Sequence, residues 1–301
     1  MKTTENLPIK LSIVVAAWNS PDYLRHCLKS LEKQCEAVDI EVIVASNFET
    51  GKHENADLFP FAKYLVAEAA TVPELRTRGI NAAGGEIIAI LEDHCEVAPE
   101  WSEEIKKAHQ PPRSIVGGAV ENISPKRALN WAVYLYDYGN YMLPNRAGAT
   151  ETLSGMNVSY KRETLAAIRD VYTNGFFETF VNEKLKQQGH QLYLAPSAVV
   201  YHRKNYDFKI VATQFYHQAR SFAAQRIAGL PFAKRILFVF AALLLPFILT
   251  MRITARTLKK NRHLGRLIAA FPYLTILLTV WAAGEFCGYL FGAGKSADYW
   301  R

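Results

Sequence analysis

The chain has 301 residues, of which 50% are hydrophobic and 21% are charged. This composition excludes a disordered or low-complexity protein, because it supplies enough apolar surface for a buried core. Lysine and arginine exceed aspartate and glutamate by 35 − 28 = 7, and this basic balance favours anionic partners. The polar start Met1–Lys10 carries no recognisable signal peptide, so we expect the catalytic part in the reducing cytoplasm. No CxxC pair occurs among the four cysteines, which indicates neither a zinc knuckle nor a disulfide scaffold.

Residues 10–205 alternate β-rich runs with helix-like runs. Predicted strands cover Leu11–Ala17, Ile40–Ala45, Tyr64–Ala67, Glu86–Leu91, Ile115–Val120 and Leu192–Tyr201. Several are near-continuous in Ile, Val and Leu, as in strands buried on both faces of a mostly parallel sheet. Predicted helices that begin with proline cover Pro21–Gln34, Pro73–Ala83 and Pro99–Ala108. We therefore predict a doubly wound α/β domain over residues 1–206.

An aromatic-rich segment precedes the end of that domain, with Trp131, Tyr134, Tyr136, Tyr138 and Tyr141. Its aromatic rings suit either acceptor stacking or packing in the core or at a membrane interface. Residues 207–234 follow, and the pattern of Asp207–Gly229 within them predicts an amphipathic helix. Two interpretations stay open for this helix: it closes the domain core, or it lies on a bilayer as an interfacial helix.

Residues 235–301 contain two hydrophobic membrane segments in our prediction. Sixteen uncharged residues lie between Arg235 and Arg252, and 18 lie between Arg266 and Glu285. A spanning helix needs roughly 20 apolar residues, so both segments are borderline in length. The linker 252–266 between them is basic. We expect the chain at the inner membrane, with its catalytic domain at the cytoplasmic face.

The topology of these two segments is open. Basic linkers favour the cytoplasmic side of a membrane, whereas a simple hairpin after a cytoplasmic domain would place linker 252–266 outside. Pro246, midway along the first segment, removes a helix hydrogen bond and favours a kink. A re-entrant or interfacial first segment would resolve the conflict, and a simple hairpin is the alternative.

Glu92-Asp93-His94 directly follows the predicted strand Glu86–Leu91. Ligands of open α/β sheets bind at the carboxyl ends of parallel strands. Two carboxylates and an imidazole in sequence can hold a divalent cation against a diphosphate. The alternative interpretation of the tripeptide is a charged turn.

Several sequence blocks carry a family resemblance. They are LSIVVAAWNSPDYLRHCLKSL, IEVIVAS, PELRTRGINAAGGEIIAILEDHCEVAPEW, GGAVEN, LSGMNVSYKRE and FFETFVNEKLKQQGHQLYLAPSAVVYH. In this order they resemble the inverting family-2 glycosyltransferases of the membrane-attached bacterial type. The resemblance spans residues 10–205 and implies the GT-A fold, a Rossmann-like, mostly parallel sheet flanked by helices, here with C-terminal membrane-associated helices.

The resemblance also implies which residues bind the nucleotide-sugar donor. It assigns them as Ala17, Asn19, Ser46, Arg76, Glu92, Asp93, Gly155 and Asn157. Arg76 would face the diphosphate, and Gly155 would permit close backbone approach. For Asn157, a structural turn is the alternative role. Ser46-Asn47-Phe48-Glu49 stands where the family has Asp-Asp-Gly-Ser, so a UDP-sugar is not specifically indicated.

A metal site at Asp93, His94 and His202 is implied in the same way. His94 replaces the usual second aspartate of the family's DxD motif, which leaves open whether Asp93 or His94 touches the ion. Because imidazole suits Mn²⁺ better than Mg²⁺, we favour Mn²⁺ over Mg²⁺. His202 ends the last predicted strand, and its alternative role is structural.

Glu178 matches the family's catalytic base. An inverting transfer needs a carboxylate that takes the proton from the acceptor hydroxyl. The first acid of the family's pair is replaced by Phe177, and Glu183 is a second candidate one turn further on. Stabilisation of a helix N-terminus is the alternative role for Glu178.

The sequence thus predicts a metal-dependent inverting hexosyltransferase that uses a nucleotide-diphosphate sugar. Its acceptor would be a hydroxyl of a lipid, a lipid-linked sugar or an envelope polysaccharide. Two alternatives are a polyprenyl-phosphate glycosyltransferase, whose phosphate acceptor needs no base, and a non-catalytic membrane nucleotide-binding scaffold. Nucleic acid is not an expected partner, because the positive residues concentrate beside the membrane segments, where they attract anionic lipid.

Overall fold

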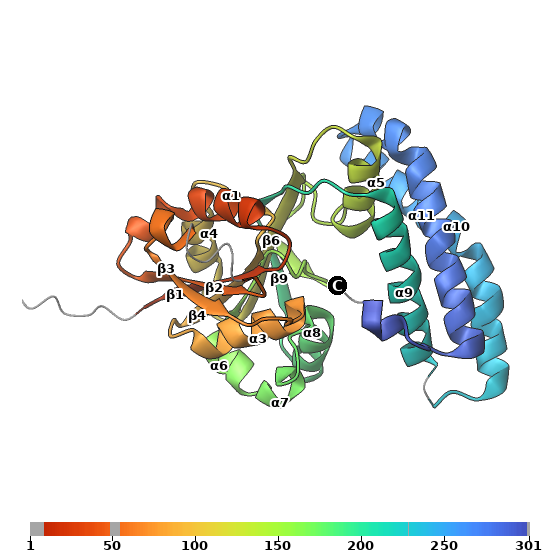
Figure 1. The fold of residues 1–301 in the computed structure, drawn as a ribbon, viewed down its shortest axis with the longest axis horizontal. Helices are drawn as coiled ribbons and strands as arrows, with labels where there is room; N and C mark the ends of the chain where they lie inside the picture. Colours follow the sequence, from red (N-terminus) through yellow and green to blue (C-terminus); the bar gives the residue numbers. More distant parts are fainter. Residues whose placement is uncertain (1–8, 49–54, 228, 300–301) are drawn as a thin grey trace, which may run out of the picture. The chain divides into compact units, whose positions relative to one another are not determined.

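The structure, a computed structural model, describes residues 9–48, 55–227 and 229–299. The chain forms two compact units (Figure 1). The sheet unit comprises Met1–Ile123 and Tyr141–Arg203, and the helical unit comprises Ser124–Asn140 and Lys204–Arg301. Residue Glu49 of the motif after the second strand lies outside the described residues.

One nine-stranded sheet forms the centre of the sheet unit. Its first half, in the order β3-β2-β1-β4, is parallel and comprises β3 (Ala62–Val66), β2 (Ile40–Ser46), β1 (Leu11–Ala17) and β4 (Ile87–Glu92). Its second half is mixed and comprises β8 (Val158–Lys161), β6 (Ile115–Asn122), β9 (Leu192–His202), β5 (Cys95–Val97) and β7 (Gly148–Thr150). The predicted α/β class is confirmed, but β8, β5 and β7 run antiparallel to their neighbours. These three strands are short, and the sequence pattern did not predict them.

Helices cover both faces of this sheet (Figure 1). They are α1 (Pro21–Leu31), α3 (Val72–Ala82), α4 (Trp101–Ala108), α6 (Arg162–Ala166), α7 (Arg169–Tyr172) and α8 (Glu178–Gln187). The start of α1 shows why the sequence folds locally as predicted. Ser20 is the N-cap and its side chain accepts from the Tyr23 N–H, and Pro21 occupies the first turn. The predicted end at Gln34 is three residues too late, because the chain tightens there into a 3₁₀ turn, η1 (Gln34–Glu36).

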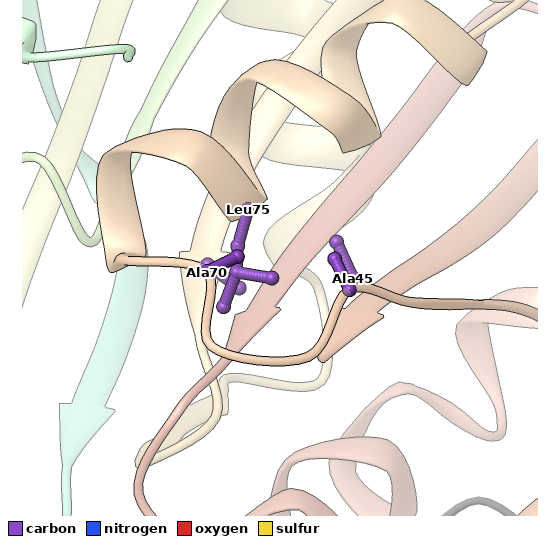
Figure 2. Packing of buried hydrophobic residues seen from close by; sticks show 5 residues of the cluster. Ala45, Ala70 and Leu75 are labelled. Atoms are coloured by element: carbon purple, nitrogen blue, oxygen red, sulfur yellow. The ribbon is translucent and has the colours of Figure 1, made fainter. Parts of the chain in front are cut away.

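A cluster of small buried residues brings α3 close to the ends of β1 and β2. It consists of Ala16, Ala45, Ala67, Ala70 and Leu75 (Figure 2). Alanine side chains leave room for the first turn of α3 to approach the strands. Thr71 and Glu74 fix that turn with a capping box, in which the Thr71 N–H donates to the Glu74 carboxylate at 2.7 Å. Arg76, the residue after Leu75, is thereby held at the carboxyl ends of the strands.

The helical unit contains α5 (Ala128–Asp137), α9 (Phe208–Arg226), α10 (Phe232–Lys260), α11 (Leu264–Phe291) and the 3₁₀ turn η2 (Ser296–Tyr299). α9 packs closely on α11, because a Cβ at Gly284 would lie 2.3 Å from the Tyr216 carbonyl oxygen and a Cβ at Gly288 2.4 Å from that of Arg220. The aromatic residues of α5 serve packing within this unit. Tyr136 contacts Trp281 of α11, with ring centroids 5.6 Å apart.

The basic linker predicted at 252–266 is helical for most of its length. α10 continues to Lys260 and α11 begins at Leu264, which leaves three residues between the helices. Arg, Ala, Leu and Lys dominate the end of α10 and are strong helix formers, which explains why the helix continues through most of the basic linker. By length and composition alone, Lys234–Lys260 and Leu264–Phe291 could each cross a membrane. Pro246 lies inside α10 and does not end it.

Candidate active site

The carboxyl ends of β1, β2 and β4 meet at one edge of the sheet. In the parallel register, Ala16 of β1 lies opposite Glu92 of β4, and Ala17 lies opposite Ser46 of β2. Ser46 is buried and its hydroxyl donates to the Phe48 carbonyl at 3.2 Å. The predicted nucleotide-binding residues Ala17, Ser46 and Glu92 are therefore brought together at this edge.

Asp93 is fully buried beneath the loop that follows β1. One of its carboxylate oxygens accepts from the backbone N–H groups of Trp18 and Asn19 at 2.9 and 2.7 Å, and the other accepts from the Asn19 side-chain amide at 2.5 Å. Its own N–H donates to the Ala16 carbonyl at 3.1 Å. The Asp93 carboxylate thus fixes the conformation of the loop after β1.

His94 lies between Asp93 and Glu92. Its Nδ1 is 3.3 Å from Asp93 Oδ1, and its Nε2 is 3.5 Å from Glu92 Oε2. The His94 ring also meets the ring of His202 edge-on, with centroids 5.1 Å apart. Because β9 ends at His202 opposite Cys95, the strand pairing places these two imidazoles together. The structure therefore joins the three residues of the predicted metal site in one cluster.

Arg76 links two carboxylates that are far apart in the sequence. Its guanidinium donates to Glu178 Oε2 at 2.8 Å and to Glu92 Oε1 at 2.6 Å. Burial alone would lower the pKa of Arg76, but the charges of Glu178 and Glu92 outweigh burial and raise its pKa above the usual value. Arg76 is therefore positively charged in this site.

Glu178 is the first residue of α8 and has a side chain that is 29% exposed. Gly155 faces its carboxylate closely, because a Cβ at position 155 would lie 2.5 Å from Glu178 Cδ. Glu183, the second candidate for the base, instead pairs with Lys186 at 3.0 Å on the exposed side of α8. Of these two acids, Glu178 is therefore the one that contacts Arg76 in the described part of the chain.

Asn157 has a different environment from the other predicted donor residues. It is fully buried, and its amide donates to the carbonyls of Ala119 and Ala198, each at 2.9 Å. Its carbonyl oxygen accepts from the Trp101 indole at 3.0 Å. These partners belong to the core, so Asn157 joins β6 and β9 to Trp101 through its side chain.

A divalent ion fits this edge of the sheet only if a bound ligand supplies further coordinating atoms. Within the three described ranges, no group of three or more His, Cys, Asp and Glu side chains is arranged to hold an ion by itself. Glu92 Oε2 and His94 Nε2 are 3.5 Å apart, a separation that suits two neighbouring ligands of one ion at about 2.0–2.2 Å. Asp93, on the other side of His94, has the position of a residue that orients a metal-binding imidazole.

Two features of the site had no signal in the sequence. The backbone N–H of Trp18 contacts Asp93 across 75 positions, and Arg76 contacts Glu178 across 102. Such contacts depend on which strand ends are neighbours, and no local sequence pattern predicts the strand order β2-β1-β4.

Comparison with known proteins agrees with the fold. A mannosyltransferase from Pyrobaculum calidifontis, PcManGT, solved in complex with GDP-Man and Mn²⁺, superposes with a TM-score of 0.56. The match covers 91% of this chain and 85% of that chain at 17% sequence identity. At this identity the likeness establishes the fold, and it confirms the predicted GT-A class.

Sequence comparison identifies the family. Over 100 residues the chain is 29% identical to "Putative glycosyltransferase EpsH" of Bacillus subtilis (strain 168), a match that spans 32% of this chain and 29% of that protein. The family model for glycosyl transferase family 2 matches residues 12–169, which is just over half of the 301 residues. This match contains Arg76, Glu92, Asp93, His94 and Gly155. The chain therefore belongs to glycosyl transferase family 2.

Proposed function

We propose that this chain is a metal-dependent inverting glycosyltransferase at the cytoplasmic face of the membrane. It would move a sugar from a nucleotide-diphosphate sugar to a hydroxyl of a lipid, lipid-linked or envelope-polysaccharide acceptor. The observation that carries this proposal is the double contact of Arg76 with Glu178 and Glu92, at 2.8 and 2.6 Å. This contact joins the base candidate Glu178 to Glu92 and Arg76, the residues that we propose for the diphosphate side of the donor.

The donor would occupy the carboxyl ends of β1, β2 and β4. Ala17, Asn19 and Ser46 border this edge, which is the usual ligand position in open α/β sheets. Arg76 would bind the diphosphate through its charge. The GDP-Man and Mn²⁺ held by PcManGT support a nucleotide-sugar donor.

The proposed ion would be held by Glu92 and His94, and the diphosphate would complete its coordination. When bound, a divalent ion offsets the negative charge that develops on the leaving diphosphate. Glu92 replaces Asp93 as the proposed carboxylate ligand of the ion, because both Asp93 oxygens already accept hydrogen bonds from N–H groups of Trp18 and Asn19. His202, edge-on to His94, would hold that imidazole in place. Mn²⁺ stays the favoured ion because imidazole is one of the two donors.

Glu178 would act as the general base. Its carboxylate takes the proton of the acceptor hydroxyl while the hydroxyl oxygen bonds to the anomeric carbon. The bond from that carbon to the diphosphate oxygen breaks on the opposite face, which inverts the configuration. Arg76 would hold the Glu178 carboxylate in position through their 2.8 Å ion pair.

Donor binding by the detergent-purified full chain tests this proposal. Thermal stability would be measured with UDP-, GDP- and dTDP-sugars, with Mn²⁺ or a chelator, and with a CMP-sugar as a donor that lacks a diphosphate. Binding at 100 times Kd adds about 2.7 kcal/mol to the free energy of unfolding. We expect one donor to stabilise the protein in the presence of Mn²⁺.

Two variants make the test specific to the site. Glu92→Gln should lose the Mn²⁺-dependent part of the shift, whereas Glu183→Gln on the exposed side of α8 should keep it. A folded wild-type protein that responds to no donor would contradict the proposal and favour the non-catalytic scaffold.

A further inference from the structure

The outer face of α10 is an apolar stripe. Leu237, Phe240, Leu244, Phe247 and Met251 recur every three or four residues, and each is between 58% and 73% exposed. Ile268, Phe271 and Ile276 of α11 are also exposed. Large apolar side chains in such number are not left in water by a soluble protein, so another phase or partner covers them.

The charge pattern around this stripe identifies what covers it. Between Asp207 and Glu285 the sequence has 11 Lys and Arg residues and no Asp or Glu. Lys234 and Arg235 lie at the start of α10, and Arg252, Lys259 and Lys260 lie toward its end. An apolar stripe with cations at both ends matches an anionic phospholipid leaflet, whose acyl chains lie beneath a layer of phosphates.

The packing of α9 argues against a simple crossing of the membrane. α9 runs beside α11 over most of its length: Phe208 contacts Tyr273, Phe215 contacts Trp281 and the Arg220 carbonyl meets Gly288. If α11 crossed the bilayer, α9 would lie at the same depth. α9 carries Gln214, Gln218, Arg220, Gln225 and Arg226, none of which is fully buried, and such side chains are unfavourable in hydrocarbon.

The length of α10 leads to the same conclusion. The 16 uncharged residues between Arg235 and Arg252 extend about 24 Å as a helix, whereas the hydrocarbon core is about 30 Å thick. If α10 crossed, Arg235 or Arg252 would lie near the edge of the hydrocarbon, and its guanidinium would have to extend outward to reach the headgroups. A helix that lies in the plane of the interface leaves both ends at the headgroups.

We propose that α9, α10 and α11 lie on one leaflet as a monotopic layer. The stripe of α10 enters the acyl boundary, the Lys and Arg residues at both ends of α10 bind lipid phosphates, and none of the three helices crosses the bilayer. Both ends of α10 are then on the same side of the membrane. This inference refines the membrane attachment of the proposed function and does not depend on glycosyl transfer.

Cysteine labelling of the full chain in membranes tests the sidedness. In a background without the half-buried Cys35 and Cys287, the variants Gln225→Cys and Lys259→Cys place one thiol before α10 and one near its end. A membrane-impermeant maleimide would be added to intact cells and to inverted vesicles. We expect both variants to react only in inverted vesicles. Labelling of Lys259→Cys only from the outside would overturn the proposal, because the chain would then cross the membrane.

A third variant and a lipid series test the contact itself. Leu244→Cys, in the middle of the stripe, should react only after detergent is added, and rapid labelling in vesicles would overturn the lipid contact. Arg252→Gln with Lys259→Gln should weaken binding to vesicles of phosphatidylcholine and phosphatidylglycerol by about 25-fold, since each charge near an anionic surface contributes about fivefold. The matched control, Lys63→Gln with Lys184→Gln in the sheet unit, should leave binding unchanged. Equal binding of wild type to vesicles of phosphatidylcholine alone would also overturn the proposed phosphate contacts.

None of these readouts uses catalysis. A chain that binds no donor but labels as expected would refute the proposed function and leave the monotopic layer intact. A chain that binds its donor but has Lys259→Cys labelled from the outside would refute the monotopic layer and leave the proposed function intact.

Discussion

Two groups of buried or half-buried polar residues in the sheet unit differ in what they bond to. The edge cluster, defined as Arg76, Glu92, Asp93, His94, Glu178 and His202, consists of ionisable side chains that contact one another and the loop after β1. The anchors, defined as Asn157, His109 and Ser159, bond to core carbonyls and to each other. Burial alone therefore does not separate function from structure in this protein.

The difference lies in the compensation of charge. The edge cluster gathers carboxylates around one guanidinium at the strand ends, which are the usual ligand position in open α/β sheets. The anchors are neutral groups whose hydrogen-bond partners belong to the core, so we expect no ligand to replace those partners. We therefore expect substitutions in the edge cluster to change activity more than stability, and substitutions of the anchors to do the reverse.

Glu178→Gln is the most severe test of the edge cluster. Glutamine keeps the size of the side chain and cannot accept the acceptor's proton, so the transfer rate to a hydroxyl should fall about 10²–10⁴-fold. Donor binding, measured by thermal shift, should persist. If product formation continues at the wild-type rate, the acceptor is a group that needs no base, as in the polyprenyl-phosphate alternative.

The acid stability of the sheet unit tests the anchors. Burial, assisted by the positive charge of Lys161, lowers the pKa of His109 to about 3 from its ordinary value of 6.5. Between these pH values the unfolded chain binds a proton that the native state does not, so stability is full above pH 6.5 and falls as pH decreases toward 3. The loss amounts to at most about 5 kcal/mol, at about 1.4 kcal/mol per pH unit.

Chemical denaturation of wild type and His109→Gln at pH 7.5 and pH 4.5 measures this effect. The variant should lose less stability over that range than wild type, because it lacks the titrating group. An identical loss in both proteins would mean that other groups cause the acid sensitivity and that His109 is not a neutral anchor.

Asn157→Ala tests the same side of the comparison without titration. It leaves the carbonyls of Ala119 and Ala198 and the Trp101 indole without their partner, and unsatisfied buried groups each cost about 1–3 kcal/mol. We expect a loss of at least about 3 kcal/mol in the free energy of unfolding, with donor affinity unchanged in the folded fraction. A stable variant with weakened donor binding would instead return Asn157 to the donor site.

The sequence was sufficient for the elements with a regular pattern. The Ile- and Val-rich runs gave β1 and β2 to within one residue, and Pro21 and Pro73 marked the starts of α1 and α3. The short strands β5 and β7 had no such signal, because three residues carry no periodicity and their pairing with β9 is made by the tertiary fold.

The sequence predicted which residues belong to the site, but it did not predict the contacts between them. Glu92, Asp93 and His94 were identified from their place after a strand, but the sequence could not tell which carboxylate faces Asn19 and which faces Arg76. Asn157 and Gly155 lie two positions apart in one motif, yet one joins the core and the other meets Glu178. That separation follows from the geometry of the turn before β8.

Gly155→Ala is the mildest test of the edge cluster. A Cβ there would lie 2.5 Å from Glu178 Cδ and 2.8 Å from both of its oxygens. Because Glu178 begins α8 and its side chain can move, we expect the fold to adapt, with stability within about 1 kcal/mol of wild type. The displaced base should lower kcat about tenfold, which corresponds to about 1.4 kcal/mol of activation free energy.

Gly84→Ala is the matched control for that substitution. Its Cβ would find the nearest atom, Glu41 Oε1, at 3.5 Å, which is ordinary contact distance. Gly84→Ala should leave kcat unchanged, so any general effect of replacing a glycine is removed from the comparison.

If Gly155→Ala kept the wild-type kcat, the position of the Glu178 carboxylate would not limit the reaction. The edge cluster would then act through charge and not through placement. If Gly155→Ala instead unfolded the protein, Gly155 would belong with the anchors.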